Sequence, residues 1–138
     1  MTKLPFHYID IRTFVYATED ERRVERAIRF LIPEEIEIDR SITEGHHGDR
    51  ILVLSARIDR ADDIQAVFDQ LADMPDYPRL QRSFPDRVTD DCELYFSLDK
   101  QQAFQNRLAL GAGISIRMKI EAYPAKPAIA IENLKALE

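Results

Sequence analysis

The sequence predicts an α+β fold: a two-layer sandwich in which helices cover one face of a mostly antiparallel sheet. Several segments alternate apolar and polar residues, which is the two-residue period of a strand with one buried face. Two other segments place apolar residues at i, i+3, i+4 and i+7, which is the period of an amphipathic helix. The predicted order along the chain is strand, helix, strand, strand, helix, strand, short helix or turn, strand, strand, helix.

Composition limits the class of protein. The chain has 138 residues, of which 45% are hydrophobic, so we expect residues 1–138 to form a single domain with a sizeable core. No apolar run approaches the roughly 20 residues of a membrane span, and the N-terminal segment lacks the apolar region of a signal peptide. The single cysteine, Cys92, excludes an intrachain disulfide. We therefore expect a cytoplasmic protein with no membrane span.

The chain is acidic overall. Lys and Arg number 19 against 25 Asp and Glu, which gives a formal net charge of -6 and a pI near 5.1. This balance argues against indiscriminate binding of nucleic acid by bulk charge, but it is compatible with a local basic face.

The first predicted strand, residues 8–16, has two different faces. One face is apolar apart from a threonine: Ile9, Ile11, Thr13 and Val15. The other face carries aromatic and charged residues: Tyr8, Asp10, Arg12, Phe14 and Tyr16. Aromatic residues in strands mostly serve packing, so we expect this second face to be covered or partly covered by another element. The alternative is an open platform on which bases stack, as in RNA-binding proteins that use a sheet.

The first predicted helix follows this strand. Thr18 and Glu21 have the spacing of a capping box, and Pro33 ends the helix. Its apolar stripe consists of Val24, Ala27, Ile28 and Leu31. The opposite side carries four arginines: Arg22, Arg23, Arg26 and Arg29. They form either a solvated face, with Glu25 at pairing distance, or a secondary basic face for anions, because the planar guanidinium suits phosphate.

Residues 34–43 and 50–58 are predicted to form the second and third strands. The turn between them contains His46 and His47, but adjacent histidines without further ligands at a known spacing do not predict a metal site. We instead expect a polar turn that contacts a partner. The second helix, capped by Asp59, has an acidic exposed face: Asp62, Asp63, Asp69 and Asp73.

Two further segments complete the predicted layers. Residues 74–91 contain several prolines and aspartates and are expected to be a connector with at most one turn of helix. The last helix is expected near Pro127, which suits a first helical turn.

The main candidate for an anion site is the segment of residues 94–120. Between Lys100 and Lys119 there is no Asp or Glu, which is unusual in an acidic protein. The period of two predicts a strand at each end, Asp99 is expected to cap a short helix, and residues 107–110 are expected to form a hairpin with the last strand. The predicted phosphate-binding residues are Lys100, Arg107, Arg117 and Lys119, with Arg12. Tyr95 or Phe104 is expected to stack on a base.

Enzyme motifs are absent from the sequence. It has no Gly-rich phosphate loop, nucleophile elbow, zinc-binding pattern or carboxylate pair whose spacing implies acid and base roles. We therefore predict a non-catalytic protein that uses no metal and no cofactor.

Three segments resemble an archaeal family of RNA-binding proteins that are predicted exosome subunits: residues 12–21 (RTFVYATEDE), 44–48 (EGHHG) and 94–104 (LYFSLDKQQAF). The likeness covers nearly the whole chain in the same order and ends in residues 122–126 (AYPAK). It implies a fold similar to that of the ribosomal protein that binds 5S RNA. It also implies a role near RNA processing, with the exosome or RNase P as neighbours, and it brings no catalytic residue.

These observations together predict a non-catalytic RNA-binding protein. We expect an accessory factor in RNA processing that binds structured RNA or a ribosomal or tRNA precursor, as a monomer or a homodimer. The alternative is a protein-interaction subunit of a processing complex that does not contact RNA directly.

Overall fold

The computed structural model describes residues 4–45, 48 and 50–137 of the chain. Its centre is a five-stranded sheet in the order β2, β3, β1, β5, β4, and every neighbouring pair of strands is antiparallel. The strands are β1 (Phe6–Val15), β2 (Asp39–Glu44), β3 (Arg50–Ile58), β4 (Glu93–Asp99) and β5 (Gly113–Ile120). The antiparallel sheet predicted from the sequence is confirmed.

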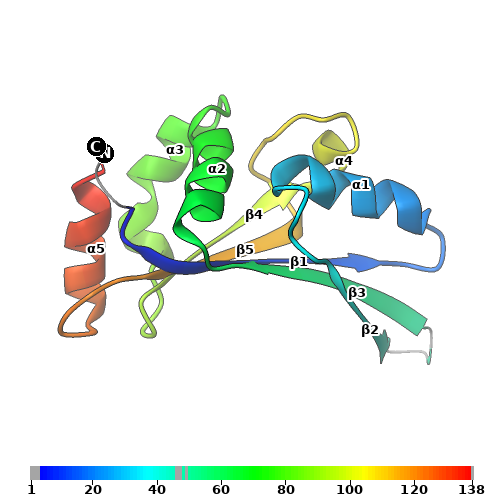
Figure 1. Cartoon of the computed structure of the whole chain (residues 1–138), viewed down its shortest axis with the longest axis horizontal. Helices are drawn as coiled ribbons and strands as arrows, with labels where there is room; N and C mark the ends of the chain where they lie inside the picture. The colour runs from blue at the N-terminus through cyan, green and yellow to red at the C-terminus, as the bar shows by residue number, and fades with distance from the viewer. Residues whose placement is uncertain (1–3, 46–47, 49, 138) are drawn as a thin grey trace.

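The helices form a second layer on one side of the sheet (Figure 1). They are α1 (Glu21–Leu31), α2 (Ala61–Ala72), α3 (Tyr77–Arg82), the short 3-10 helix η1 (Phe84–Arg87), α4 (Lys100–Ala103) and α5 (Pro127–Lys135). In Figure 1, α1 and α4 lie over one half of the sheet, α2 and α3 lie over the other half, and α5 stands at the end. Among the described residues, no helix is long and apolar enough to cross a membrane. Because the helices cover one side of an antiparallel sheet, the predicted α+β two-layer sandwich is confirmed.

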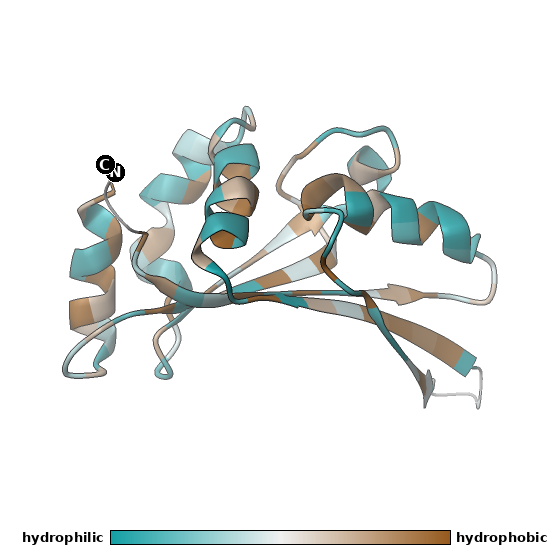
Figure 2. Cartoon of the chain, in the orientation of Figure 1, coloured by the Kyte–Doolittle hydropathy of each residue, from teal (hydrophilic) through white to brown (hydrophobic). Residues whose placement is uncertain are grey.

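The core lies between the two layers. Because strand side chains alternate, each strand sends one set of apolar residues toward the helices. Ile9 and Ile11 of β1 and Ile116 of β5 are 0% exposed, and full burial of such a side chain stabilises the fold by about 1.5–3 kcal/mol. Val24 and Ile28 of the apolar stripe of α1 belong to the same buried core, and Figure 2 shows hydrophobic and hydrophilic residues alternating along α1 and α2. The other set of strand side chains points away from the helices.

The starts of two helices differ from the prediction. Asp20, and not Thr18, is the N-cap of α1, and its carboxylate accepts a hydrogen bond of 3.0 Å from the backbone N–H of Arg22. Thr18 lies in the preceding turn, which the side chain of Glu19 holds closed by accepting a backbone hydrogen bond. Likewise, Arg60 occupies the cap position of α2 in place of the preceding aspartate, without a side-chain cap bond.

The second strand is shorter than predicted. It begins at Asp39 because the residues before it form turns after α1. Arg29 holds these turns, since its guanidinium donates hydrogen bonds to the carbonyl of Glu34, at 3.1 Å, and to that of Ile36. The backbone of this segment is therefore bound to the end of α1 rather than to β3.

The connector after α2 contains more structure than predicted. It forms α3 and η1, and the apolar side chains of Leu80 and Phe84 join the core. The expected hairpin strand over residues 107–110 does not form, because only Leu110 bridges to Leu98. The N–H of Leu110 instead donates to a carboxylate oxygen of Asp76, at 2.8 Å. Both corrections depend on contacts between segments that are far apart in the sequence.

Candidate nucleic-acid interface

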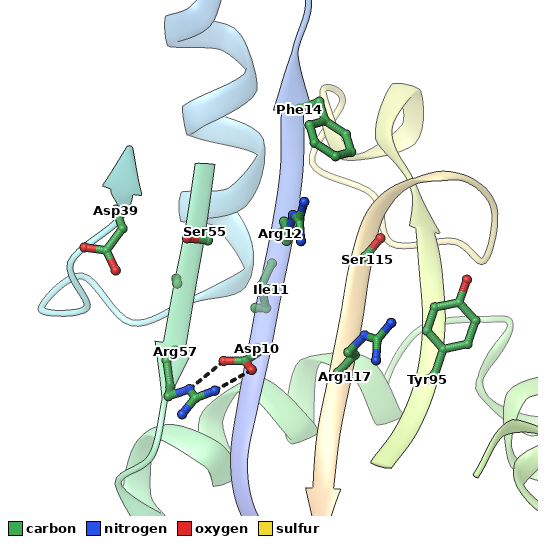
Figure 3. A pocket seen from close by; sticks show the side chains of 11 residues that line it. Asp10, Ile11, Arg12, Phe14, Asp39, Ser55, Arg57, Tyr95, Ser115 and Arg117 are labelled. Atoms are coloured by element: carbon green, nitrogen blue, oxygen red, sulfur yellow. Dashed lines mark hydrogen bonds and ion pairs between the residues drawn. The ribbon is translucent and has the colours of Figure 1, made fainter. Parts of the chain in front are cut away.

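The sheet face opposite the helices is open, and Figure 3 views part of it directly. Tyr95 of β4 is 43% exposed on this face. Tyr8 and Phe14 of β1 are half-buried, but arginine side chains shield them rather than another element. The guanidinium carbon of Arg57 lies 4.1 Å from the ring centre of Tyr8, and that of Arg12 lies 5.3 Å from the ring centre of Phe14. The aromatic face of the first strand is therefore partly covered, by arginine side chains of the sheet itself.

A groove crosses the strands on this face because one cross-strand row consists mostly of serines. Arg12 pairs with Ser55 on β3 and with Ser115 on β5, and Ser115 pairs in turn with Ser97 on β4. Directly opposed side chains in a sheet are neighbours on the same face. Since serine side chains are short, this row forms the floor of the groove, and Arg12 is its only long side chain.

Longer side chains of the adjacent rows form the walls. One wall is the row formed by Arg57, Asp10, Arg117 and Tyr95. Phe14 stands on the other side of the floor, and Asp39 of β2 lies at one end (Figure 3). The hollow between them has a volume of about 440 Å³. It has room for a small polar ligand or for part of a larger one.

The arginines of the groove differ in how far they are neutralised. Arg57 donates two hydrogen bonds to Asp10, from Nε to Oδ1 at 2.7 Å and from Nη2 to Oδ2 at 2.8 Å, and this pairing raises the pKa of Arg57. Nη1 of Arg117 lies 3.6 Å from a carboxylate oxygen of Glu93. Arg12 forms no ion pair with any carboxylate that the structure describes. The charge of Arg12 is therefore free to meet an anion.

A third cross-strand row, formed by Tyr8, Lys119 and Glu93, extends the open face beyond the groove. Tyr8 donates a long hydrogen bond of 3.4 Å to Glu93. Burial raises the pKa of the Tyr8 hydroxyl, and the negative charge of Glu93 raises it further, so this hydroxyl stays protonated. Lys119 donates from Nζ to the backbone carbonyl of Asp91, which holds its ammonium just before the start of β4.

Lys100 does not belong to an exposed basic patch. It is 7% exposed, and its Nζ donates to Oε1 of Glu19 at 2.7 Å and to the carbonyl of Phe14. Asp99 caps α4 as predicted, but this turn directs the next side chain inward, against the start of β5 at Gly113. The prediction that Lys100 holds phosphate therefore conflicts with its burial and its ion pair.

Arg107 and Phe104 lie on the helix side of the molecule. Arg107 is exposed and lines a hollow of about 510 Å³ together with Phe30 of α1 and Met74. The ring of Phe104 lies under Arg23 of α1, with the guanidinium carbon 4.6 Å from the ring centre. The seven predicted site residues thus do not form one patch. The open face holds four of them: Arg12, Tyr95, Arg117 and Lys119.

The secondary basic face on α1 is only partly as predicted. Arg29 is used structurally, because its guanidinium binds backbone carbonyls. Arg23 and Arg26 line a small hollow of about 290 Å³ with Phe104 and Asn106. Among the described residues, no ion pair neutralises the arginines on the exposed side of this helix: Arg22, Arg23 and Arg26. The expected pairing with Glu25 is absent from that same set.

Sequence reasoning missed the contribution of β3 to the groove. Ser55 lies on the floor and Arg57 in the wall, and both alternate with buried residues of the strand. The apolar Ile51 and Val53 occupy the same face earlier in β3, and they hid this signal. The alternation of Ser55 and Arg57 with buried residues of β3 was nevertheless a signal that both lie on the open face.

Metal ligands do not gather in the part of the chain that the structure describes. No group of three or more His, Cys, Asp or Glu side chains could hold a metal ion there. The turn with His46 and His47, which was expected to contact a partner, lies outside the described residues.

Comparison with known proteins relates the chain to archaeal proteins. RNA-binding protein PAB1135 of Pyrococcus abyssi is 32% identical over 144 residues, which cover 96% of this chain and 94% of that protein. A solved DUF54 protein of Methanothermobacter thermautotrophicus has 33% identity and a TM-score of 0.83, over 96% of this chain and 97% of its own. A solved DUF54 protein of Archaeoglobus fulgidus has 25% identity and a TM-score of 0.86, over 96% and 99%.

A family model described as RNA binding matches residues 8–122, which include the whole of the groove. The chain therefore belongs to this RNA-binding family.

Proposed function

We propose that this protein is a non-catalytic RNA-binding protein whose open sheet face binds an unpaired stretch of RNA. The position of Arg12 carries the proposal. This arginine has no carboxylate partner among the described residues, and it lies on the floor of an open groove near the aromatic side chains of Phe14 and Tyr95. Membership of a family described as RNA binding, and the name of the Pyrococcus relative, support the same function.

Each kind of side chain in the groove suits a different part of an RNA strand. The exposed ring of Tyr95 can stack on a base, and bases of unpaired RNA are free to stack on aromatic rings. The guanidinium carbon of Arg117 lies 5.5 Å from the centre of that ring, so Arg117 can contact a phosphate next to a stacked base. The hydroxyls of Ser55 and Ser115 can bond base edges or a ribose 2′-hydroxyl.

Carboxylates on the same face limit the electrostatic contribution. The described strands place four cations on the open face: Arg12, Arg57, Arg117 and Lys119. Carboxylates on the same face of the described strands include Asp10, Asp39 and Glu93. A duplex would bring a continuous line of phosphates close to these carboxylates, whereas a single strand can present bases to them. We therefore expect unpaired RNA to bind more tightly than a duplex of the same length.

Fluorescence anisotropy with a labelled single-stranded RNA and the matching duplex tests the proposal. Arg12→Ala should weaken binding of the single strand by roughly tenfold, as removal of a charged hydrogen bond of about 1.5 kcal/mol predicts. Arg82→Ala is the matched control, because Arg82 is an exposed arginine of α3 on the helix side. Equal effects of the two substitutions, or no binding of any RNA at low salt, would refute the proposal.

We also propose that the arginines of α1 form a second contact with the RNA backbone. Stacking on Phe104 fixes the plane of the Arg23 guanidinium, and Arg26 lines the same hollow. This surface lies in the helix layer, so it would bind a different part of the RNA from the groove. Replacing both arginines with alanine should weaken the binding of long RNA. The affinity for a short oligonucleotide, which fills only the groove, should not change.

The cellular setting that we propose is an RNA-processing assembly such as the exosome or RNase P. The proposal comes from the likeness to an archaeal family of predicted exosome subunits. The acidic side of α2 is the surface offered to a basic protein partner: Asp62, Asp63, Asp69 and Asp73. Charge reversal at Asp63 and Asp69 should weaken binding to purified subunits of such an assembly and leave RNA affinity unchanged. Loss of RNA binding in the same variant would instead indicate a folding defect.

A further inference from the structure

Within residues 4–45, 48 and 50–137, other segments pair with one of the two edges of the sheet and leave the second without a partner. At the β4 edge, isolated bridges join Val88 to Leu94 and Leu110 to Leu98. The N–H of Asp99 on this strand also donates to a carbonyl outside the sheet. Both ends of the outer side of β4 are therefore paired.

The other edge, β2, is bare. All six of its residues are exposed, and Ile42 near its centre is 65% exposed. Within the described chain, the backbone of β2 forms hydrogen bonds with β3 and with no other element. An exposed edge strand presents a row of unpaired N–H and C=O groups that can pair with another strand.

The side chains of β2 are arranged so that the strand complements a second copy of itself. Arg40 and Glu44 flank Ile42 symmetrically, and alternation places all three on the same face of the sheet. Directly opposed residues of an antiparallel pair lie on the same face, so each symmetric register of two β2 strands is centred on one residue. The two such registers with the greatest overlap are centred on Ser41 and on Ile42. The register centred on Ser41 would place Arg40 opposite the partner's Ile42. The register centred on Ile42 places Arg40 opposite the partner's Glu44 and brings the two isoleucines together.

We propose that this protein forms a homodimer in which the β2 strands of two copies pair antiparallel around Ile42. Opposite charges directly across two strands stabilise the pairing, and like charges destabilise it, so the charges select this register. The contact is isologous, with a two-fold axis at Ile42. It joins the two sheets into one continuous sheet with both open faces on the same side, and it does not depend on RNA binding.

An intrachain contact orients the side chain that the dimer uses. Arg40 forms an ion pair with Glu21 of α1, which holds the guanidinium on the helix side of the sheet. A guanidinium has five N–H donors, so it can bind Glu21 and the partner's Glu44 together. A single pair of short strands buries a small area, and the dimer is therefore weak and requires high protein concentration.

Sedimentation velocity of the full chain over a range of concentrations tests the dimer. The wild-type protein should change from monomer to dimer as concentration rises. Arg40→Glu and Glu44→Arg should each remain monomeric, because each variant faces like charges across the two-fold axis. An equimolar mixture of the two variants should associate again, since every opposed pair then has opposite charges. The double variant Arg40→Glu with Glu44→Arg should also dimerise.

Two controls separate the dimer from effects on folding. Circular dichroism and the thermal midpoint report whether each variant is folded. Glu21→Gln removes the intrachain partner of Arg40 without changing the charges of β2, and it should still dimerise. A wild-type protein that stays monomeric at every concentration would overturn the proposal. So would folded single variants that dimerise like the wild type, or a mixture of them that fails to associate.

Discussion

The ammonium nitrogen of Lys100 lies 2.7 Å from Oε1 of Glu19, and it also donates to the backbone carbonyl of Phe14. These contacts tie the start of α4 to the turn between β1 and α1. Lys100 follows Glu19 by 81 residues and Phe14 by 86 residues along the chain. A cation that the sequence suggests for RNA binding thus holds two distant segments of the fold together.

Replacing Lys100 should therefore affect stability more than RNA binding. Lys100→Ala leaves the partly buried carboxylate of Glu19 without its partner, and we expect the free energy of unfolding to fall by roughly 2–4 kcal/mol. Urea denaturation at neutral pH measures this decrease. Lys135→Ala, an exposed lysine of α5, is the control and should change stability by less than about 0.5 kcal/mol. Equal midpoints for wild type and Lys100→Ala would show that the pair contributes nothing.

The same ion pair predicts a dependence of stability on pH. Burial raises the pKa of Glu19, but the hydrogen bonds from Lys100 and from the backbone N–H of Tyr16 lower it more, so the net pKa lies below the ordinary value of 4.5. A carboxylate with a lowered folded pKa stabilises the fold above its unfolded pKa, and this contribution is lost as pH falls through the folded value.

Glu19→Gln tests this dependence because it removes the charge and keeps the shape. The difference in unfolding free energy between wild type and Glu19→Gln should be largest near neutral pH and should shrink as the pH falls below 4.5. Urea denaturation of both proteins over this pH range measures it. A difference that grows on acidification would contradict the lowered pKa.

Tyr95 is the side chain best placed to stack on a base. Tyr95→Ala should weaken binding of single-stranded RNA by about 1–3 kcal/mol, which is the usual value of a base stacked on an aromatic residue. Tyr123→Ala is the control, since Tyr123 is 79% exposed and lies outside the groove, beside His7. Anisotropy titrations of both variants measure the effect, and equal affinities for the two would exclude stacking on Tyr95.

The two arginines of the groove that are least neutralised should set the salt dependence of binding. Replacing Arg12 and Arg117 together with alanine should reduce the slope of log K against log salt by roughly 1.4, because each phosphate that a protein neutralises on a single strand contributes about 0.7. Lys119→Ala should change the slope less, because the ammonium of Lys119 is bound to the carbonyl of Asp91. An unchanged slope in the double variant would show that these arginines do not bind phosphate.

Local patterns predicted much of the fold because they depend on neighbours in the sequence. The alternation of apolar residues located β1, β3, β4 and β5, and Asp99 was correctly predicted to cap α4. Its side chain accepts a hydrogen bond of 3.0 Å from the N–H of Gln102, only three residues away. The predicted cap of α1, Thr18, was wrong. Glu19 is used in a turn with a distant lysine, and Asp20 caps the helix, which begins at Glu21.

The candidate site was predicted less well for the same reason. The absence of Asp and Glu between Lys100 and Lys119 suggested one basic patch. In the fold, however, strand residues alternate between the two faces of the sheet, and other residues of the segment lie in the helix layer. Arg117 and Lys119 therefore reach the open face with Tyr95, whereas Arg107 lies beside α1 and Lys100 lies inside. Spacing in the sequence does not measure distance across a sheet.

Residues close together in the chain are enough to show which segments alternate, which helices are amphipathic and which family the chain resembles. Which charges remain free depends instead on how distant segments meet in the folded protein. Arg57 is neutralised by Asp10 across 47 residues, and Lys100 by Glu19 across 81. Arg12 is left without such a partner among the described residues. An ion pair forms wherever folding brings two groups together, and that position is set by strand pairing rather than by order along the chain.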